Sequence, residues 1–219
     1  MPARLTPGRT HLWARYATRR RARRLQAQYA APADCDGLPV PPGSLWGWRP
    51  EAWRTRLAAP AAPASGTSVA ADMVLFHDGD SAALVLDQAA GQGPPPHGVG
   101  IAATGFRGSF LSLAITLPGA GHRAIARDQL LRCDVEIAGD AAAQIYARLN
   151  VQNGPDRVEA IRHVPTARGS LAVTFDLACM DFSPVRVERI WLDLIFNDLG
   201  TGRVLIGDLL LSRQRRAAL

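Results

Sequence analysis

The chain has 219 residues, 47% hydrophobic and 20% charged, which suits one medium-sized domain with an extension and excludes disorder throughout. Its longest apolar run, residues 205–211, contains Gly207 and Asp208 and falls far short of the roughly 20 residues that a membrane-spanning helix needs. The formal net charge is +6, and all 25 basic residues are arginine.

The positive charge is concentrated at the N-terminus, where residues 1–31 hold eight arginines and no acidic residue. Residues 10–30 contain no glycine or proline and predict a helix. Such a basic helical arm is typical of non-specific binding to nucleic acid or to an anionic membrane surface. The arginines expected to carry this binding are Arg15, Arg19, Arg20, Arg21, Arg23 and Arg24.

No apolar segment follows these arginines, so neither a secretory nor a twin-arginine export signal is complete. We therefore expect a cytoplasmic protein, with a peripheral position at the membrane as a variant of that expectation.

Residues 32–71 form a lead-in rich in proline, alanine and glycine that also contains Trp46, Trp48 and Trp53. Indole rings carry a large apolar surface and usually find something to cover. We expect this segment to pack onto the domain that follows.

Beyond Asp72 the hydrophobic period is two, which is typical of strands with one buried face. No helical period separates these runs, so crossover helices for a parallel sheet are missing and the strands must pair antiparallel. We expect an all-β fold over residues 72–219, an antiparallel β-sandwich of jelly-roll-like form or a barrel. The expected strands are residues 74–77, 83–88, 99–104, 109–117, 131–137, 144–152, 157–164, 171–177, 190–196 and 204–211.

The sequence offers little chemistry. The three cysteines have no metal-ligand spacing, and Cys133 and Cys179 fall on the inward side of their strands, so we expect small buried side chains. The run from His77 to Asp80 has the composition of a turn and too few ligands for a metal site. We expect neither a metal nor a cofactor. Phosphate loops, zinc-protease helices and nucleophile elbows are absent from the sequence, which favours a protein that is not an enzyme.

The outward faces of two strands are the best candidates for a binding site. Alternate residues share a face, so Tyr146, Arg148 and Asn150 lie together, and so do Trp191 and Asp193. If the two strands are neighbours, an aromatic and polar patch forms, of the kind that sugar-binding sandwiches use. The alternative, which the sequence favours because the chain supplies its own aromatic cover, is that the Trp-rich lead-in buries both rings.

Several strings in order resemble a bacterial family classed as a domain of unknown function. The strings are Trp48-Arg49-Pro50-Glu51-x-Trp53, Leu75-Phe76-His77-Asp78, Gly108-Ser109-Phe110-Leu111-Ser112-Leu113, Ala147-Arg148-Leu149-Asn150, Phe175-Asp176-Leu177-Ala178 and Trp191-Leu192-Asp193-Leu194-Ile195-Phe196. The resemblance covers residues 46–219 and implies one unit with a shared Trp-containing lead-in, but no activity and no catalytic residues. More loosely, residues 202–211 resemble the closing strand of carbohydrate-binding sandwiches, which is analogy at the level of the fold.

Three functions stay open on this basis. The first is a non-catalytic binding or interaction module, with a glycan as the best single ligand. The second is docking of the basic arm on nucleic acid or an anionic membrane, with the sandwich as scaffold. The third is an enzyme whose site is assembled across loops. The sequence does not indicate the oligomeric state.

Overall fold

The computed structural model describes residues 35, 37–58, 62–91, 93–122, 124–140, 143–165 and 169–217. The expected basic arm and its helix lie outside these residues. Within them the chain is almost entirely β, and no helix is long and apolar enough to cross a membrane.

Each of the ten expected strands is present, and two more lie near the N-terminus. The strands are β1 (Ser44–Trp48), β2 (Thr67–Ala70), β3 (Met73–His77), β4 (Leu84–Ala90), β5 (His97–Ala103), β6 (Leu111–Thr116), β7 (Gln129–Gly139), β8 (Gln144–Asn153), β9 (Asp156–Val164), β10 (Gly169–Asp176), β11 (Val187–Asn197) and β12 (Gly202–Arg215). Short helices connect some of them: α2 (Glu51–Arg54), α3 (Gly119–His122) and the 3₁₀ turns η2 (Ser81–Ala83), η3 (Leu177–Cys179) and η4 (Pro184–Arg186).

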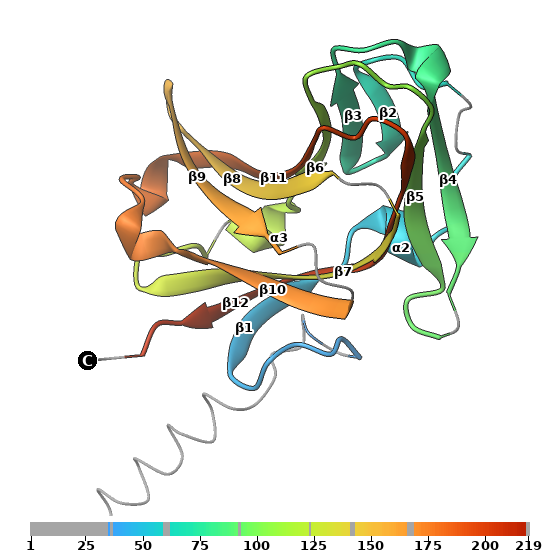
Figure 1. Ribbon diagram of the computed structural model, residues 1–219. Helices are drawn as coiled ribbons and strands as arrows, with labels where there is room; N and C mark the ends of the chain where they lie inside the picture. The colour runs from blue at the N-terminus through green and yellow to red at the C-terminus, as the bar shows by residue number, and fades with distance from the viewer. Residues whose placement is uncertain are drawn as a thin grey trace, which may run out of the picture.

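The strands form two antiparallel sheets, which confirms the expected β-sandwich. The first sheet has the order β10-β7-β12-β5-β4, with β1 also paired to β12, and the second has the order β2-β3-β6-β11-β8-β9. Figure 1 shows β11, β8 and β9 in one layer and β12, β7 and β10 in the layer facing it. Strands from both sides of residue 72 therefore belong to the sandwich, since β1 and β2 each extend one of its sheets.

Side-chain alternation explains the core. On β11 the inward residues Ile190, Leu192, Leu194 and Phe196 are all buried. The inward residues of β7 are buried as well. Because successive side chains of a strand point to opposite faces, these rows meet between the sheets and leave every second residue for the outside.

The turn between β8 and β9 shows how the local sequence sets the register. Asn153 pairs with Asp156, which leaves Gly154 and Pro155 as the loop. Gly154 has a φ of +63°, a conformation that glycine adopts without steric cost. The expected tight turn at Asn153-Gly154 is thus present, with glycine at the first loop position.

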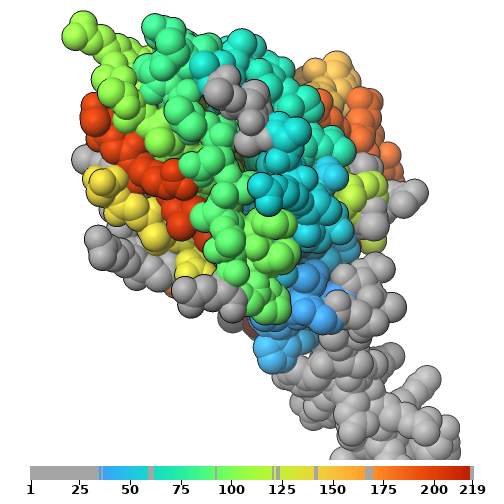
Figure 2. All heavy atoms as spheres, turned by 90° about the vertical axis from the view of Figure 1, so that its right-hand side faces the viewer, coloured from blue at the N-terminus to red at the C-terminus, as the bar shows by residue number. Residues whose placement is uncertain are grey.

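The Trp-containing lead-in is tied to the first sheet. Trp53, on α2, is fully buried, and its indole N–H donates to the carbonyl oxygen of Ile206 at 3.0 Å. Arg49 forms a two-pronged pair with Asp208 on β12, with N···O distances of 2.8 and 2.7 Å. Gln88 of β4 accepts from the backbone N–H of Leu57 at 2.7 Å, and Figure 2 shows the blue and cyan lead-in lying alongside the green strands β4 and β5.

The cysteine expectation is half right. Cys133 is fully buried on β7, and burial raises the pKa of its thiol. Cys179 is exposed, because the chain leaves β10 at Asp176 and turns into η3 before reaching it. The alternation of inward and outward side chains on β10 therefore ends at Asp176 and does not extend to Cys179.

Candidate functional site

The outer face of the second sheet brings β3, β6, β11 and β8 side by side. Phe76, Ser112, Ile195 and Tyr146 form one row across these strands, in the register of their backbone pairs. The next row on the same face runs from Ala114 through Asp193 to Arg148, and the one after it from Thr116 through Trp191 to Asn150. The two strands that carry the sequence candidates, β8 and β11, are thus direct neighbours.

A groove of about 650 Å³ lies on this face. Its apolar lining comes from Phe76, Phe110, Ala114, Trp191 and Ile195. Its polar lining comes from Ser112, Arg148, Arg189 and Asp193. Phe76 and Phe110 are 42% and 37% exposed, so two phenyl rings face solvent at the end of the groove away from Trp191.

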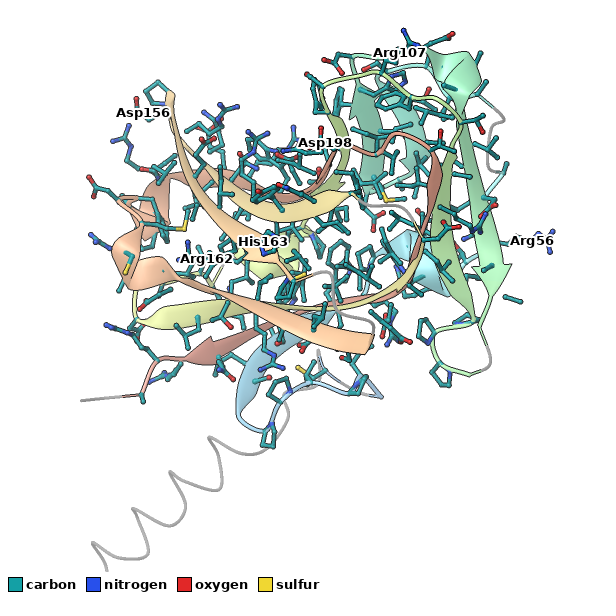
Figure 3. The ribbon with its side chains drawn as sticks, viewed as in Figure 1. Arg56, Arg107, Asp156, Arg162, His163 and Asp198 are labelled. Atoms are coloured by element: carbon teal, nitrogen blue, oxygen red, sulfur yellow. The ribbon has the colours of Figure 1, made fainter. Side chains whose placement is uncertain are left out.

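Three of the five sequence candidates line the groove: Arg148, Trp191 and Asp193. Asn150 is fully buried beside them and takes part in their hydrogen bonds. Tyr146 shares the face but is not among the lining residues. Its ring packs edge-on against His163 at 5.3 Å, and its hydroxyl donates to Gln144 at 3.0 Å. Figure 3 places His163 on β9, toward the edge of the sheet.

A hydrogen-bond network holds the polar side of the groove. Arg148 donates from Nε and Nη2 to Oδ2 of Asp193, at 3.0 and 2.8 Å. Asn150 donates from Nδ2 to the same oxygen at 2.9 Å and to the carbonyl oxygen of Arg148 at 3.1 Å. Asp193 is only 4% exposed, so its charge depends on these three donors.

Two oxygens at this face lack a hydrogen-bond partner among the described residues. They are Oγ of Ser112, on the groove lining, and Oδ1 of Asn150, beneath it. A buried polar atom without a partner costs free energy and is uncommon in folded proteins. Both atoms therefore have unused hydrogen-bonding capacity next to the groove.

Arg189 lies beside Trp191 along β11. Its guanidinium carbon sits 4.8 Å from the centre of the indole ring, a cation–π arrangement. Its Nη2 atom is 3.4 Å from the hydroxyl of Thr116, which is a weak contact. Trp191 itself is only partly buried.

The expectation that the Trp-rich lead-in covers this face is wrong. Trp46 and Trp53 are buried against the first sheet, through β1 pairing with β12 and through the contact of Trp53 with Ile206. The second sheet keeps its outer face open at Trp191, where the groove is. The indoles of the lead-in pack against an apolar surface of the first sheet, which is the other layer of the sandwich.

Sequence reasoning missed six lining residues: Phe76, Phe110, Ser112, Ala114, Ile195 and Arg189. All but Phe110 have the outward parity of their strands, so the same rule that selected Trp191 applies to them. Phe110 precedes β6 and has no strand parity to read.

Asp78 fixes the position of Phe110. Its carboxylate accepts from the hydroxyl of Ser109 at 2.5 Å and from the backbone N–H of Phe110 at 3.1 Å. These hydrogen bonds, the Ser109 hydroxyl first, lower the pKa of Asp78. One end of the groove thus depends on a loop-to-loop clamp between β3 and β6.

The turn around Asp78 uses its other polar groups internally. The ring nitrogens of His77 lie 3.0 Å from the carbonyl oxygens of Gly79 and Pro63. Asp80 accepts from the backbone N–H of Ala82 at 2.9 Å. Across the described part of the chain, no three His, Cys, Asp or Glu side chains gather in a way that could hold a metal ion.

Known structures resemble the sandwich at low sequence identity. A family 11 carbohydrate-binding module from Clostridium thermocellum, in complex with a β-1,3-1,4-mixed-linked tetrasaccharide, gives a TM-score of 0.45 at 9% identity, over 70% of this chain and 95% of that one. A family 30 carbohydrate-binding module gives 0.42 at 10% identity, over 80% and 91%. The enzymatically active domain of bacteriophage CBA120 tailspike protein 4 gives 0.45 at 7% identity over 66% of this chain, which spans 19% of that protein's chain.

The model of a family of unknown function, DUF6478, matches residues 14–219. None of the curated proteins matches the chain.

Proposed function

This chain belongs to DUF6478, a family of unknown function, and we propose that its sandwich is a non-catalytic module that binds a glycan in the groove of the second sheet. The observation that carries the proposal is the combination, in one open groove of about 650 Å³, of solvent-facing aromatic rings with a fixed hydrogen-bonding network. Small-molecule sites are typically concave and mostly apolar, with a few placed polar groups.

The aromatic rings match the apolar faces of sugar rings. Trp191 lies at one end of the groove and Phe76 with Phe110 at the other. A large exposed aromatic side chain is costly to leave in water, so the exposed rings of Phe76 and Phe110, on one groove with the half-buried Trp191, indicate a surface that is covered in use. A pyranose ring offers C–H groups on its faces and hydroxyls on its rim, which suits this lining.

The polar groups match sugar hydroxyls. Asp193, itself held by Asn150, fixes the partly exposed guanidinium of Arg148, so this donor does not have to be reorganised when a ligand enters. Hydroxyls of a glycan can accept hydrogen bonds, and the exposed guanidinium groups of Arg148 and Arg189 on the lining are donors.

The length of the groove favours a chain over a single sugar. From Trp191 to Ile195, at the row of Phe76, the distance along β11 is about 13 Å at the usual rise of a strand. Aromatic rings at both ends of that length fit a short oligosaccharide.

The lining of the groove supports binding of a glycan without its hydrolysis. Its carboxylate is Asp193, which is 4% exposed and accepts three N–H bonds. Glycoside hydrolysis usually needs two carboxyl groups flanking the scissile bond, one of which exchanges a proton.

A glycan array tests this function. The full-length protein and its Trp191→Ala variant are applied to the same array of neutral and acidic oligosaccharides. We expect the wild-type protein to bind a related set of oligosaccharides and the variant to lose that set. Val85, 47% exposed on the first sheet, provides the matched control, and Val85→Ala should bind as wild type does. Equal binding by wild type and Trp191→Ala, or no binding by wild type, contradicts the proposal.

A further inference from the structure

The groove presents its positive charges to solvent and hides its negative one. The Arg148 side chain is 31% exposed, whereas the Asp193 side chain with which it pairs is 5% exposed. Arg148 uses Nε and Nη2 on Asp193. Its Nη1 group makes no hydrogen bond to any described residue. A ligand in the groove therefore meets the guanidinium of the ion pair and not the carboxylate.

Arg189 is a second cation on the same lining. It is exposed, and no described carboxylate lies within ion-pair distance of it. Its guanidinium carbon lies 4.8 Å from the centre of the Trp191 ring, and apart from the weak contact of Nη2 with Thr116 its N–H groups make no hydrogen bond to a described residue. A guanidinium held in this way is ready to pair with an oxyanion beside the indole.

A neighbouring ion pair on this face leaves the excess of positive charge at the groove unchanged. Arg157 and Glu159, on β9, approach each other at 3.7 Å and neutralise one another. Arg148 lies two backbone-pair rows from Arg189, with Trp191 and Asn150 in the row between them. The indole is therefore flanked by two guanidinium groups along the direction of the strands.

We propose that the groove selects a glycan that carries an oxyanion, a uronate carboxylate or a sulfate ester, with the sugar ring against Trp191 and the oxyanion on Arg189. This inference rests on the proposed glycan-binding function and names its ligand class. Charge-assisted hydrogen bonds from arginine to an oxyanion are stronger than those between neutral groups.

Isothermal titration calorimetry on the full-length protein compares charged and uncharged forms of the same sugar. Tetragalacturonate is set against its methyl ester, and a sulfated galactan tetrasaccharide against its desulfated form, all at one ionic strength. At least one charged ligand should bind about tenfold tighter than its uncharged form, the size expected for a hydrogen bond to a charged group. Whichever charged ligand shows this preference identifies the oxyanion.

Two variants separate the groove from general attraction to a basic protein. Arg189→Gln should reduce the preference for the charged ligand to about threefold or less while keeping the affinity for the uncharged form, because Trp191 is intact. Arg157→Gln removes the same charge from the same sheet but outside the groove, and should leave the preference unchanged.

Equal binding of charged and uncharged sugars, or an equal effect of Arg157→Gln and Arg189→Gln, overturns the inference. If the uncharged sugars bind in a Trp191-dependent way, the proposed function survives that result. If no sugar binds at all, both fail together.

Discussion

Arg148 directs two of its N–H groups at a single oxygen of Asp193, and the two residues come from neighbouring strands. The pair is asymmetric: the carboxylate is buried and the guanidinium is partly exposed. Removing the arginine therefore leaves a buried charge with one remaining side-chain donor, Asn150, whereas removing the carboxylate charge leaves a cation that water can reach. This asymmetry makes the network testable.

Arg148→Gln should lower the free energy of unfolding by about 2 kcal/mol, because a buried charge loses its partner; the full cost of breaking a buried pair is discounted here for the exposed side of Arg148. Asp193→Asn should cost less, about 1 kcal/mol, because no charge is left buried. Urea denaturation of both variants measures the two values. A larger loss for Asp193→Asn would mean that the pair is not asymmetric in energy.

Trp53→Ala should destabilise the protein by about 3–5 kcal/mol, since the indole is fully buried and its N–H is bonded to Ile206. A chain that starts near Ala71 and lacks β1, α2 and β2 should melt well below one that starts near Gly43. Val185→Ala, at a side chain that is 92% exposed, is the control and should be neutral. If the two shortened chains melt at the same temperature, the lead-in contributes nothing to stability.

Gly139→Ala should be strongly destabilising. Gly139 has a φ of +132°, and a Cβ added there would collide with the carbonyl group of Arg203, which is backbone and cannot move aside. Gly105→Ala is the matched control, because its φ of +64° is also positive but nothing lies within 4 Å of the added atom. We expect the control to cost about 1 kcal/mol and Gly139→Ala clearly more. Thermal melts compare the two, and equal losses would contradict the packing described for β7 and β12.

The clamp at Asp78 predicts a pH dependence. Hydrogen bonds from Ser109 and Phe110 lower the pKa of Asp78 in the folded protein, so its contribution to stability is present above the unfolded value of about 3.9 and disappears as the pH falls through the folded value. Asp78→Asn should therefore be less stable than wild type at pH 7, and the difference should shrink in strongly acidic solution. Urea melts at both pH values provide the test, and a constant difference would contradict the assignment.

The sequence predicted the strands well because burial of one face imposes a period of two on each of them separately. It placed Trp191 and Arg148 on outward faces for the same reason. It did not predict that β11 lies between β6 and β8, because strand order is set by contacts far apart in the chain. Three Trp residues indicated that the lead-in needed an apolar surface, but both layers of the sandwich present one, and the choice depended on Arg49 meeting Asp208 and on Trp53 meeting Ile206.

Phe76 and Phe110 extend the site beyond the sequence candidates. If the groove takes an oligosaccharide, Phe76→Ala should weaken a tetrasaccharide about tenfold and a disaccharide bound at Trp191 hardly at all. Titration of both ligands measures the difference. A uniform loss for long and short ligands would place the phenyl ring outside the binding path.

The central claim is that Trp191 faces an open glycan groove and not a second core. The most direct measurement is a thermal melt of Trp191→Ala beside wild type, followed by calorimetric titration of both proteins with the oligosaccharide that the array identifies. We predict a destabilisation of about 1–2 kcal/mol, below the 3–5 kcal/mol of a buried aromatic side chain, together with a loss of affinity of about thirtyfold. A loss of stability in the range of buried aromatic side chains, or unchanged affinity in a folded variant, would contradict the account.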